Sequence, residues 1–213
     1  MINGIIAVVL GYLLGSIPSA YIATRVATGK DIRQLGGGNV GGLNVYREVG
    51  AVPAFAAGIA DVGKGAAAVA IAYWLLDVPL SGPFVLLTAL AAVAGHNWMV
   101  FLKFSGGKGM GAAIGTLSIL FPLYGYPLGL AFFFGIVLIP FIITRNVALS
   151  MGIGLVSLPF ITWLGVKSTP FIIFSIVLGL IILVKFIPTA RAALAKVGSK
   201  KDFIFDHRQR GKR

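Results

Sequence analysis

Cysteine is absent from this sequence, and acidic residues and histidines are scarce. The 213 residues include six Asp or Glu and two His. Without cysteine the chain has no disulfide, no thiol nucleophile and no thiolate metal site. Two histidines and six scattered acids supply too few ligands for a metal centre. We therefore expect no metal site, and little scope for chemistry that needs clustered His or paired carboxylates.

Charge is also sparse, whereas apolar residues are abundant. Charged residues make up 11% of the chain and hydrophobic residues 58%, although a soluble domain carries about 25% charged residues. This composition excludes a soluble globular enzyme, a disordered protein and a secreted disulfide scaffold. The net charge of +12 indicates either nucleic-acid binding or the cytoplasmic side of a membrane protein. The positions of the charges distinguish these two classes.

Seven apolar stretches are long enough, or nearly so, to cross a bilayer. The hydrocarbon core is about 30 Å thick and needs about 20 helical residues. Polar backbone groups in lipid must be satisfied within their own segment, which favours helices over open strands. We predict an all-α polytopic membrane protein with seven transmembrane helices at approximately Ile2–Thr24, Ala51–Leu76, Pro83–Phe101, Met110–Tyr124, Leu128–Thr144, Val147–Gly165 and Phe171–Ile187.

The basic residues lie almost entirely on one side of this arrangement. Of the 18 Lys and Arg residues, 16 fall in alternate connections or in the C-terminal segment. The positive-inside rule then places the N-terminus outside and the C-terminus in the cytoplasm. Topology explains most of the charge, so we expect no nucleic-acid partner. Residues 1–187 are predicted to form one bundle and 188–213 a basic cytoplasmic tail, either solvated or lying on anionic lipid.

Two of the predicted cytoplasmic connections, residues 31–47 and 95–111, combine glycines with cations. Glycine permits positive φ, so that successive N–H groups point together at one anion. Arg binds a phosphate through two parallel hydrogen bonds, and Lys adds charge. The positive end of the helix predicted after Gly109 adds to this field. The pattern favours a phosphate site at the membrane surface; the alternative is that glycine is simply common in membrane helices and turns.

Two opposite charges lie inside the second apolar stretch. Asp61 and Lys64 are three residues apart, which places them on one helix face. A charge at the bilayer centre costs roughly 3 kcal/mol on insertion scales, so such residues usually pair or serve a site. We predict an internal ion pair, with a direct substrate role as the alternative.

The apolar stretches and the glycine-rich connections together contain a set of short motifs in a fixed order. They are Leu14-Gly15-Ser16-Ile17-Pro18, Asp31-Ile32-Arg33, Gly36-Gly37-Gly38-Asn39, Asn44, Arg47, Asp61, Lys64-Gly65, Gly95-His96, Phe101, Phe104 and Gly106-Gly107-Lys108-Gly109. These motifs resemble those of the bacterial membrane acyl-phosphate:glycerol-3-phosphate acyltransferases of the PlsY type. The similarity covers nearly the whole chain and includes the seven-span topology.

The resemblance implies transfer of a fatty acyl group from acyl phosphate to glycerol 3-phosphate. The products are lysophosphatidic acid and phosphate, made for phospholipid biosynthesis at the bacterial inner membrane, with the active face cytoplasmic and with neither metal nor other cofactor. Arg47 and Lys108 match catalytic phosphate-binding positions. The implied substrate-binding residues are Gly36, Gly37, Gly38, Asn39, Asn44, Gly106, Gly107 and Gly109. His96 is the one obvious side-chain base, unless a donor phosphate oxygen takes the acceptor proton.

Several positions depart from the family pattern, including Leu43, Met99 and Ala112, and three of the departures leave other functions open. Gly37 stands where the first motif has serine, and Phe186 and Thr189 stand where the third has His and Asn. These differences make a phosphate-ligand-binding paralogue with weak or no transfer the main alternative. A transporter is the lesser one, because its polar residues are expected near the bilayer midplane. Neither acyl-chain preference nor oligomeric state follows from the sequence.

Overall fold

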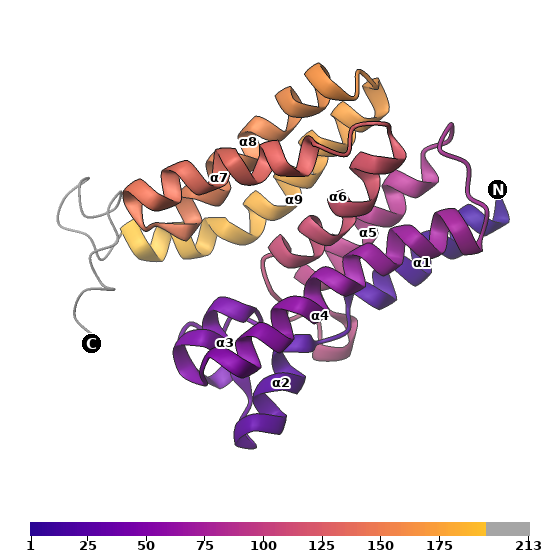
Figure 1. The fold of residues 1–213 in the computed structure, drawn as a ribbon. Coiled ribbons are helices and arrows are strands. Elements are labelled where there is room, and N and C mark those ends of the chain that lie inside the picture. The colour runs from indigo at the N-terminus through magenta and orange to yellow at the C-terminus, as the bar shows by residue number, and fades with distance from the viewer. Residues whose placement is uncertain (195–213) are drawn as a thin grey trace. The chain divides into compact units, whose positions relative to one another are not determined.

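The computed structural model describes residues 1–194, and this part is helical throughout, with no strand (Figure 1). The all-α expectation is therefore confirmed. In chain order the elements are α1 (Ile2–Gly15), α2 (Ser19–Thr28), η1 (Ile32–Gln34), α3 (Gly42–Glu48), α4 (Ala51–Ala70), η2 (Ile71–Leu75), α5 (Phe84–Asn97), η3 (Val100–Leu102), α6 (Met110–Leu123), α7 (Gly129–Thr144), α8 (Val147–Gly165) and α9 (Thr169–Leu194).

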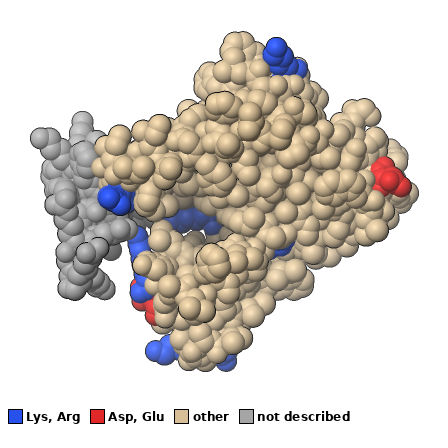
Figure 2. Space-filling view, in the orientation of Figure 1, with Lys and Arg blue, Asp and Glu red and all other residues tan. Residues whose placement is uncertain are grey.

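All seven apolar stretches are helical, but not all are long enough by themselves to span a bilayer. Four segments meet the requirements of length and composition: Ile2–Thr28, Ala51–Leu75, Phe84–Leu102 and Thr169–Pro188. Three apolar helices are shorter: Met110–Leu123, Gly129–Thr144 and Leu149–Gly165. The face in Figure 2 is dominated by uncharged side chains, as a lipid-facing surface requires. The seven-span count and the orientation stay predictions.

The first predicted span is wrong as one continuous helix. Helix α1 ends at Gly15 and α2 begins at Ser19, with Pro18 between them. Proline has no N–H and its ring clashes with the carbonyl four residues earlier, so a helix breaks there. The break exposes the carbonyl of Ile17, which accepts hydrogen bonds from the backbone N–H of Ser19 at 3.0 Å and from Lys64 Nζ at 2.8 Å.

The chain divides into two compact units, and the first, Met1–Leu123, contains α1 to α6. Its long helices pack through small residues. A Cβ on Gly11 of α1 would lie 2.8 Å from the carbonyl oxygen of Thr88 in α5, and a Cβ on Gly15 would overlap the carbonyl of Ala92. Small residues of this kind let membrane helices approach closely and gain van der Waals contact.

A small hydrophobic cluster lies under the connections of this unit. It joins buried side chains from α2, η1, α3, α4 and the segment around η3: Ala20, Ile32, Val40, Val45, Ala57, Met99 and Leu102. Because the cluster contains residues of both glycine-rich connections, burial of its apolar surface holds these two segments together. It is the part of the fold that positions the candidate site.

The second unit begins at Tyr124 and contains α7, α8 and α9. Helix α7 ends at Thr144, and the next residue, Arg145, has φ of +57°. The Asn146 side chain caps α8 by accepting the backbone N–H of Leu149 at 3.1 Å. Helix α9 continues to Leu194, seven residues past the predicted end of the bundle at 187. The division at 187/188 stays a prediction, and residues 195–213 of the predicted tail lie outside the described part.

Candidate functional site

The first glycine-rich connection is framed by the side chain of Asn44 on α3. Its Nδ2 donates to the carbonyl oxygens of Leu35 and Asn39, each at 3.1 Å, and its Oδ1 accepts the backbone N–H of Gly37 at 3.4 Å. Asn44 is 9% exposed. An amide that satisfies three backbone groups at once holds a turn that has no helix or strand of its own. Asn44, predicted to bind substrate, therefore also acts as an internal brace.

The three consecutive glycines of this connection differ in backbone conformation. Gly36 and Gly38 have φ of +53° and +68°, the left-handed region that glycine adopts without steric cost. Gly37 has no such φ, and its N–H is turned inward to Asn44. Asn39 is half-buried beside them. The expected positive φ is thus found at two of the three glycines.

Asp31 and Arg33 form a local ion pair at the start of this connection. Asp31 caps η1 by accepting the backbone N–H of Arg33 at 2.9 Å, and the Arg33 guanidinium lies 2.6 Å from the Asp31 carboxylate. The hydrogen bond from Arg33 lowers the pKa of Asp31 below its ordinary value. Arg33 therefore stabilises the turn at η1.

The second glycine-rich connection packs against the end of α5. The N–H of Gly107 donates to the carbonyl oxygen of His96 at 3.0 Å, and a Cβ on Gly106 would overlap the carbonyls of His96 and Asn97. Gly109 has φ of +78° and directly precedes α6. The predicted helix start after this connection is confirmed. Glycine is needed at 106 because two backbones meet there, and at 109 because the chain turns.

The two connections contact each other directly. The backbone N–H of Val40 donates to the carbonyl oxygen of Gly106 at 3.4 Å, and a Cβ on Gly107 would lie 2.7 Å from the carbonyl oxygen of Val40. Segments about 65 residues apart in the sequence are therefore joined. The meeting of the two glycine-rich connections, on which the sequence argument for a phosphate site depends, is present in the structure.

Arg47 and Lys108, the two predicted catalytic cations, come from these two connections and are electrostatically coupled. Arg47 is exposed on α3, and Lys108 is half-buried directly before α6. Burial, and after it the positive charge of Arg47, lower the pKa of Lys108 below its ordinary value. Like charges held near one another favour a shared anion, because the anion removes the repulsion between them. The arrangement is suited to binding a phosphate.

His96 is placed differently from what a solvent-facing base would require. Its side chain is 3% exposed. Its Nδ1 lies 3.3 Å from Oδ1 of Asp61 on α4, and its Nε2 faces Gly107, where a Cβ would overlap it. The contact with Asp61 was not foreseen from the sequence, because it joins two helices 35 positions apart and no spacing rule signals it.

The ion pair predicted between Asp61 and Lys64 is confirmed. Lys64 Nζ lies 2.8 Å from Oδ1 of Asp61, and the residues are 6% and 4% exposed. Among the described residues no group of three or more His, Cys, Asp or Glu is placed to hold a metal ion.

The third-motif positions fall in α9 of the second unit. Phe186 is half-buried, and Thr189 belongs to the helix but its side chain lies outside the described part. The structure thus gives no polar group at position 186.

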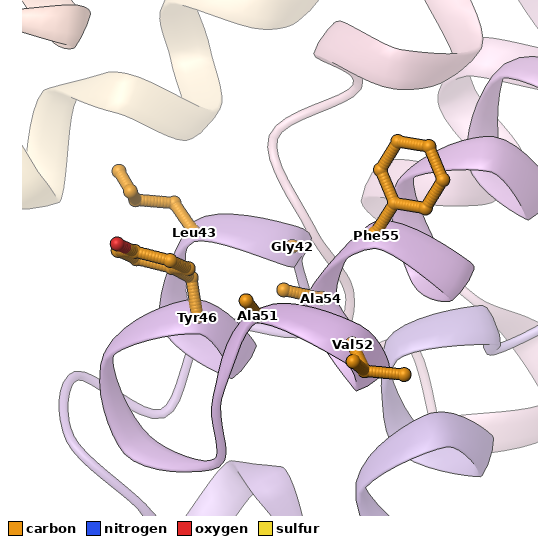
Figure 3. Close-up of a pocket in the computed structure, with 7 residues that line it drawn as sticks. All are labelled: Gly42, Leu43, Tyr46, Ala51, Val52, Ala54 and Phe55. Carbon is orange, nitrogen blue, oxygen red and sulfur yellow. The ribbon is translucent and has the colours of Figure 1, made fainter.

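An open apolar cleft of about 650 Å³ lies on α3 and the start of α4. In Figure 3, Leu43 and Tyr46 project from α3, and Phe55 projects from α4. The exposed fractions of these three side chains are 42%, 60% and 71%. The cleft has the lining Gly42, Leu43, Tyr46, Ala51, Val52, Ala54 and Phe55.

Comparison with known proteins places these features in one family. The family model described as glycerol-3-phosphate acyltransferase matches residues 5–196. Glycerol-3-phosphate acyltransferase 1 of Dehalococcoides mccartyi is 48% identical over 204 residues, covering 96% of this chain and 97% of its own length. The glycerol-3-phosphate acyltransferase of a Synechococcus species is 38% identical, covering 93% of this chain and 96% of its own.

Solved structures agree with these relatives. The crystal structure of PlsY, an integral membrane glycerol 3-phosphate acyltransferase, in its glycerol 3-phosphate form is similar with a TM-score of 0.78 and 28% identity, covering 90% of this chain and 92% of that one. Its lysophosphatidic acid form gives a TM-score of 0.76. The chain belongs to the glycerol-3-phosphate acyltransferase family of integral membrane proteins.

Proposed function

We propose that this protein transfers a fatty acyl group from acyl phosphate to glycerol 3-phosphate, giving lysophosphatidic acid and inorganic phosphate. The observation that carries the proposal is the direct hydrogen bond from Val40 to Gly106, which joins the two glycine-rich connections that contain Arg47 and Lys108, in a chain of this family. Both substrates carry a phosphate, so the enzyme must hold two anions close together. Two cations from different segments meet that requirement.

The proposed reaction needs positioning and charge stabilisation more than a strong base. The acceptor hydroxyl oxygen bonds to the acyl carbon, and the bond from that carbon to the donor phosphate oxygen breaks. The hydroxyl proton goes to a phosphate oxygen of the donor, which leaves as inorganic phosphate. Arg47 and Lys108 stabilise charge on the phosphates and on the acyl oxygen as the transition state forms. Holding the two reactants together removes much of the entropic barrier.

The apolar cleft on α3 and the start of α4 is a suitable place for the acyl chain. Its walls are the aliphatic and aromatic side chains of these two helices, and α3 also carries Arg47. The positive-inside asymmetry supports a multi-pass protein of the bacterial inner membrane, with its N-terminus outside and the site on the cytoplasmic face.

An assay of the purified protein tests the proposal. With acyl phosphate and glycerol 3-phosphate supplied together, phosphate release should match lysophosphatidic acid formation. Binding of glycerol 3-phosphate without product would instead identify the binding paralogue, and uptake into proteoliposomes would identify a transporter. Complementation of a bacterial strain lacking this acyltransferase, with the native chain and with Lys108→Ala, extends the test to the cell.

The coupling of the two cations predicts a pH effect. Lys108 binds an anion best when protonated, so the KM for glycerol 3-phosphate should rise as pH climbs through its lowered pKa. Arg47→Gln removes one of the two causes of that lowering and should raise the pKa of Lys108 part of the way back. In Arg47→Gln the rise in KM should then begin at higher pH than in the native protein. Its KM should be larger at every pH, because one phosphate-binding cation is lost.

The measurement is KM between pH 7 and 10 for the native protein, Arg47→Gln and a control, Arg33→Gln. Arg33 is paired with Asp31 and does not contribute to the lowered pKa of Lys108. In the control, KM should therefore begin to rise at the same pH as in the native protein. An identical onset in Arg47→Gln would show that the two cations do not interact.

A further inference from the structure

A chain of buried polar contacts connects the break between α1 and α2 to the second glycine-rich connection. It runs from the carbonyl oxygen of Ile17 to Lys64 Nζ at 2.8 Å, then to Asp61 at 2.8 Å, and then to His96 Nδ1 at 3.3 Å. The opposite edge of the His96 ring, Nε2, lies directly against Gly107. The side chains come from α4 and α5, and all three are at most 6% exposed.

Burying such a network carries a cost that a purely apolar packing would avoid. Taking an ion pair out of water loses several kcal/mol of hydration per ion, and replacing such pairs by apolar residues is often neutral or stabilising. The Asp61–Lys64 pair is therefore weak evidence for a role in stability alone. Its contact with a histidine that touches the anion-binding segment indicates a role in placing that segment.

His96 is placed to contact the second glycine-rich connection. Its Nδ1 lies 3.3 Å from Oδ1 of Asp61, and its Nε2 lies beside Gly107, where a Cβ would overlap it. The backbone carbonyl of His96 also accepts the N–H of Gly107 at 3.0 Å. The ring is therefore placed to set the position of the connection that contains Lys108.

We propose that Asp61 and His96 are positioning residues, which hold the Gly106–Gly109 segment in the conformation that binds the phosphate of glycerol 3-phosphate. Lys64 ties the same network to the carbonyl exposed by the Pro18 break, so that the α1–α2 junction and the phosphate segment share one buried support. This inference rests on the proposed function and assigns residues outside the substrate contacts to acceptor binding.

The test is the steady-state kinetics of Asp61→Asn, which keeps the side-chain shape and removes the charge that orients the ring. KM for glycerol 3-phosphate should rise about tenfold or more, because a displacement of about 1 Å in a positioned group can cost 10²-fold. The pH dependence of kcat should stay native. His96→Asn removes the ring edge that lies against Gly107, and it should raise KM by a similar factor while the pH dependence of kcat stays native. The double variant, Asp61→Asn with His96→Asn, should raise KM no further than either single variant.

The control is Thr88→Val, a nearly isosteric change at a fully buried residue of α5 whose hydroxyl bonds only within its own helix, to Phe84 at 2.7 Å. Its KM should stay native even if thermal stability falls. Unchanged KM in Asp61→Asn, or additive effects in the double variant, would overturn the proposal. A fall in kcat with loss of the acidic limb of its pH profile would also overturn it, by making His96 the base.

Two safeguards keep the outcome decisive. If Asp61→Asn cannot be purified folded, His96→Asn carries the same expectation, and a native KM there overturns the proposal. Calorimetric titration of the full chain with glycerol 3-phosphate alone distinguishes failure of the acyltransferase proposal from failure of the positioning proposal. A native protein that binds glycerol 3-phosphate but makes no product refutes the acyltransferase proposal, whereas the Kd of Asp61→Asn still tests the positioning role.

Discussion

Replacing Lys108 with alanine is expected to lower kcat/KM for acyl transfer by about 10³-fold, near the upper end of what removing one transition-state donor costs. Lys108 is half-buried, so its charge acts in a medium less polar than water and is worth more than that of a surface lysine. It also lies where the second glycine-rich connection meets α6. The measurement is lysophosphatidic acid formation by the purified variant under saturating donor.

The matched control is Lys103→Asn. Lys103 belongs to the same connection but is exposed, with φ of +54°, and asparagine tolerates this left-handed conformation. The control removes one positive charge five residues before Lys108 without entering the site, and it should keep nearly native activity. Equal losses in the two variants would mean that general positive charge at the surface, and not Lys108 itself, supports the reaction.

The second large effect is expected from Gly106→Ala, which should reduce kcat/KM by about 10²-fold, the scale of a displaced positioned group. The new Cβ would overlap the backbone carbonyls of His96 and Asn97, which cannot move aside as a flexible side chain does. The connection would have to shift, breaking the hydrogen bond from Val40 to Gly106. Kinetics should show a raised KM for glycerol 3-phosphate together with reduced turnover.

Gly63→Ala provides the control for that substitution. Gly63 lies inside α4, and a Cβ built there meets no heavy atom within 4 Å. Alanine favours the helix over glycine by about 1 kcal/mol, so the control should be active and at least as stable to heat as the native chain. Native kinetics in Gly106→Ala would show that the close approach of the two connections is not needed for function.

The helices of this chain and the ion pair between Asp61 and Lys64 were predictable from local patterns. Long apolar stretches cannot leave their backbone groups unsatisfied in lipid, so they become helices, and all seven do. Asp61 and Lys64 pair because their spacing places them on one helix face. The two connections rich in glycine and cations were recognisable because that composition is unusual between apolar segments.

Other features depended on contacts between distant segments. The apolar pattern extended the first predicted span through Pro18, where the helix breaks, and it did not signal that Lys64 Nζ binds the carbonyl of Ile17 at this break. The requirement for glycine at position 106 comes from the approach of the α5 end and not from positive φ. The placement of His96 beside Gly107 and its contact with Asp61 likewise arise only when α4, α5 and the second connection pack together.

The amino-acid sequence by itself determined that this is a helical membrane chain and predicted an anion-binding surface, because hydropathy, charge asymmetry and glycine content act through local chemistry and the bilayer. Only the tertiary structure decided which distant groups meet: Val40 with Gly106, and Asp61 with His96. These pairs are separated by dozens of residues, and their meeting follows from helix packing through small side chains, which no local pattern specifies.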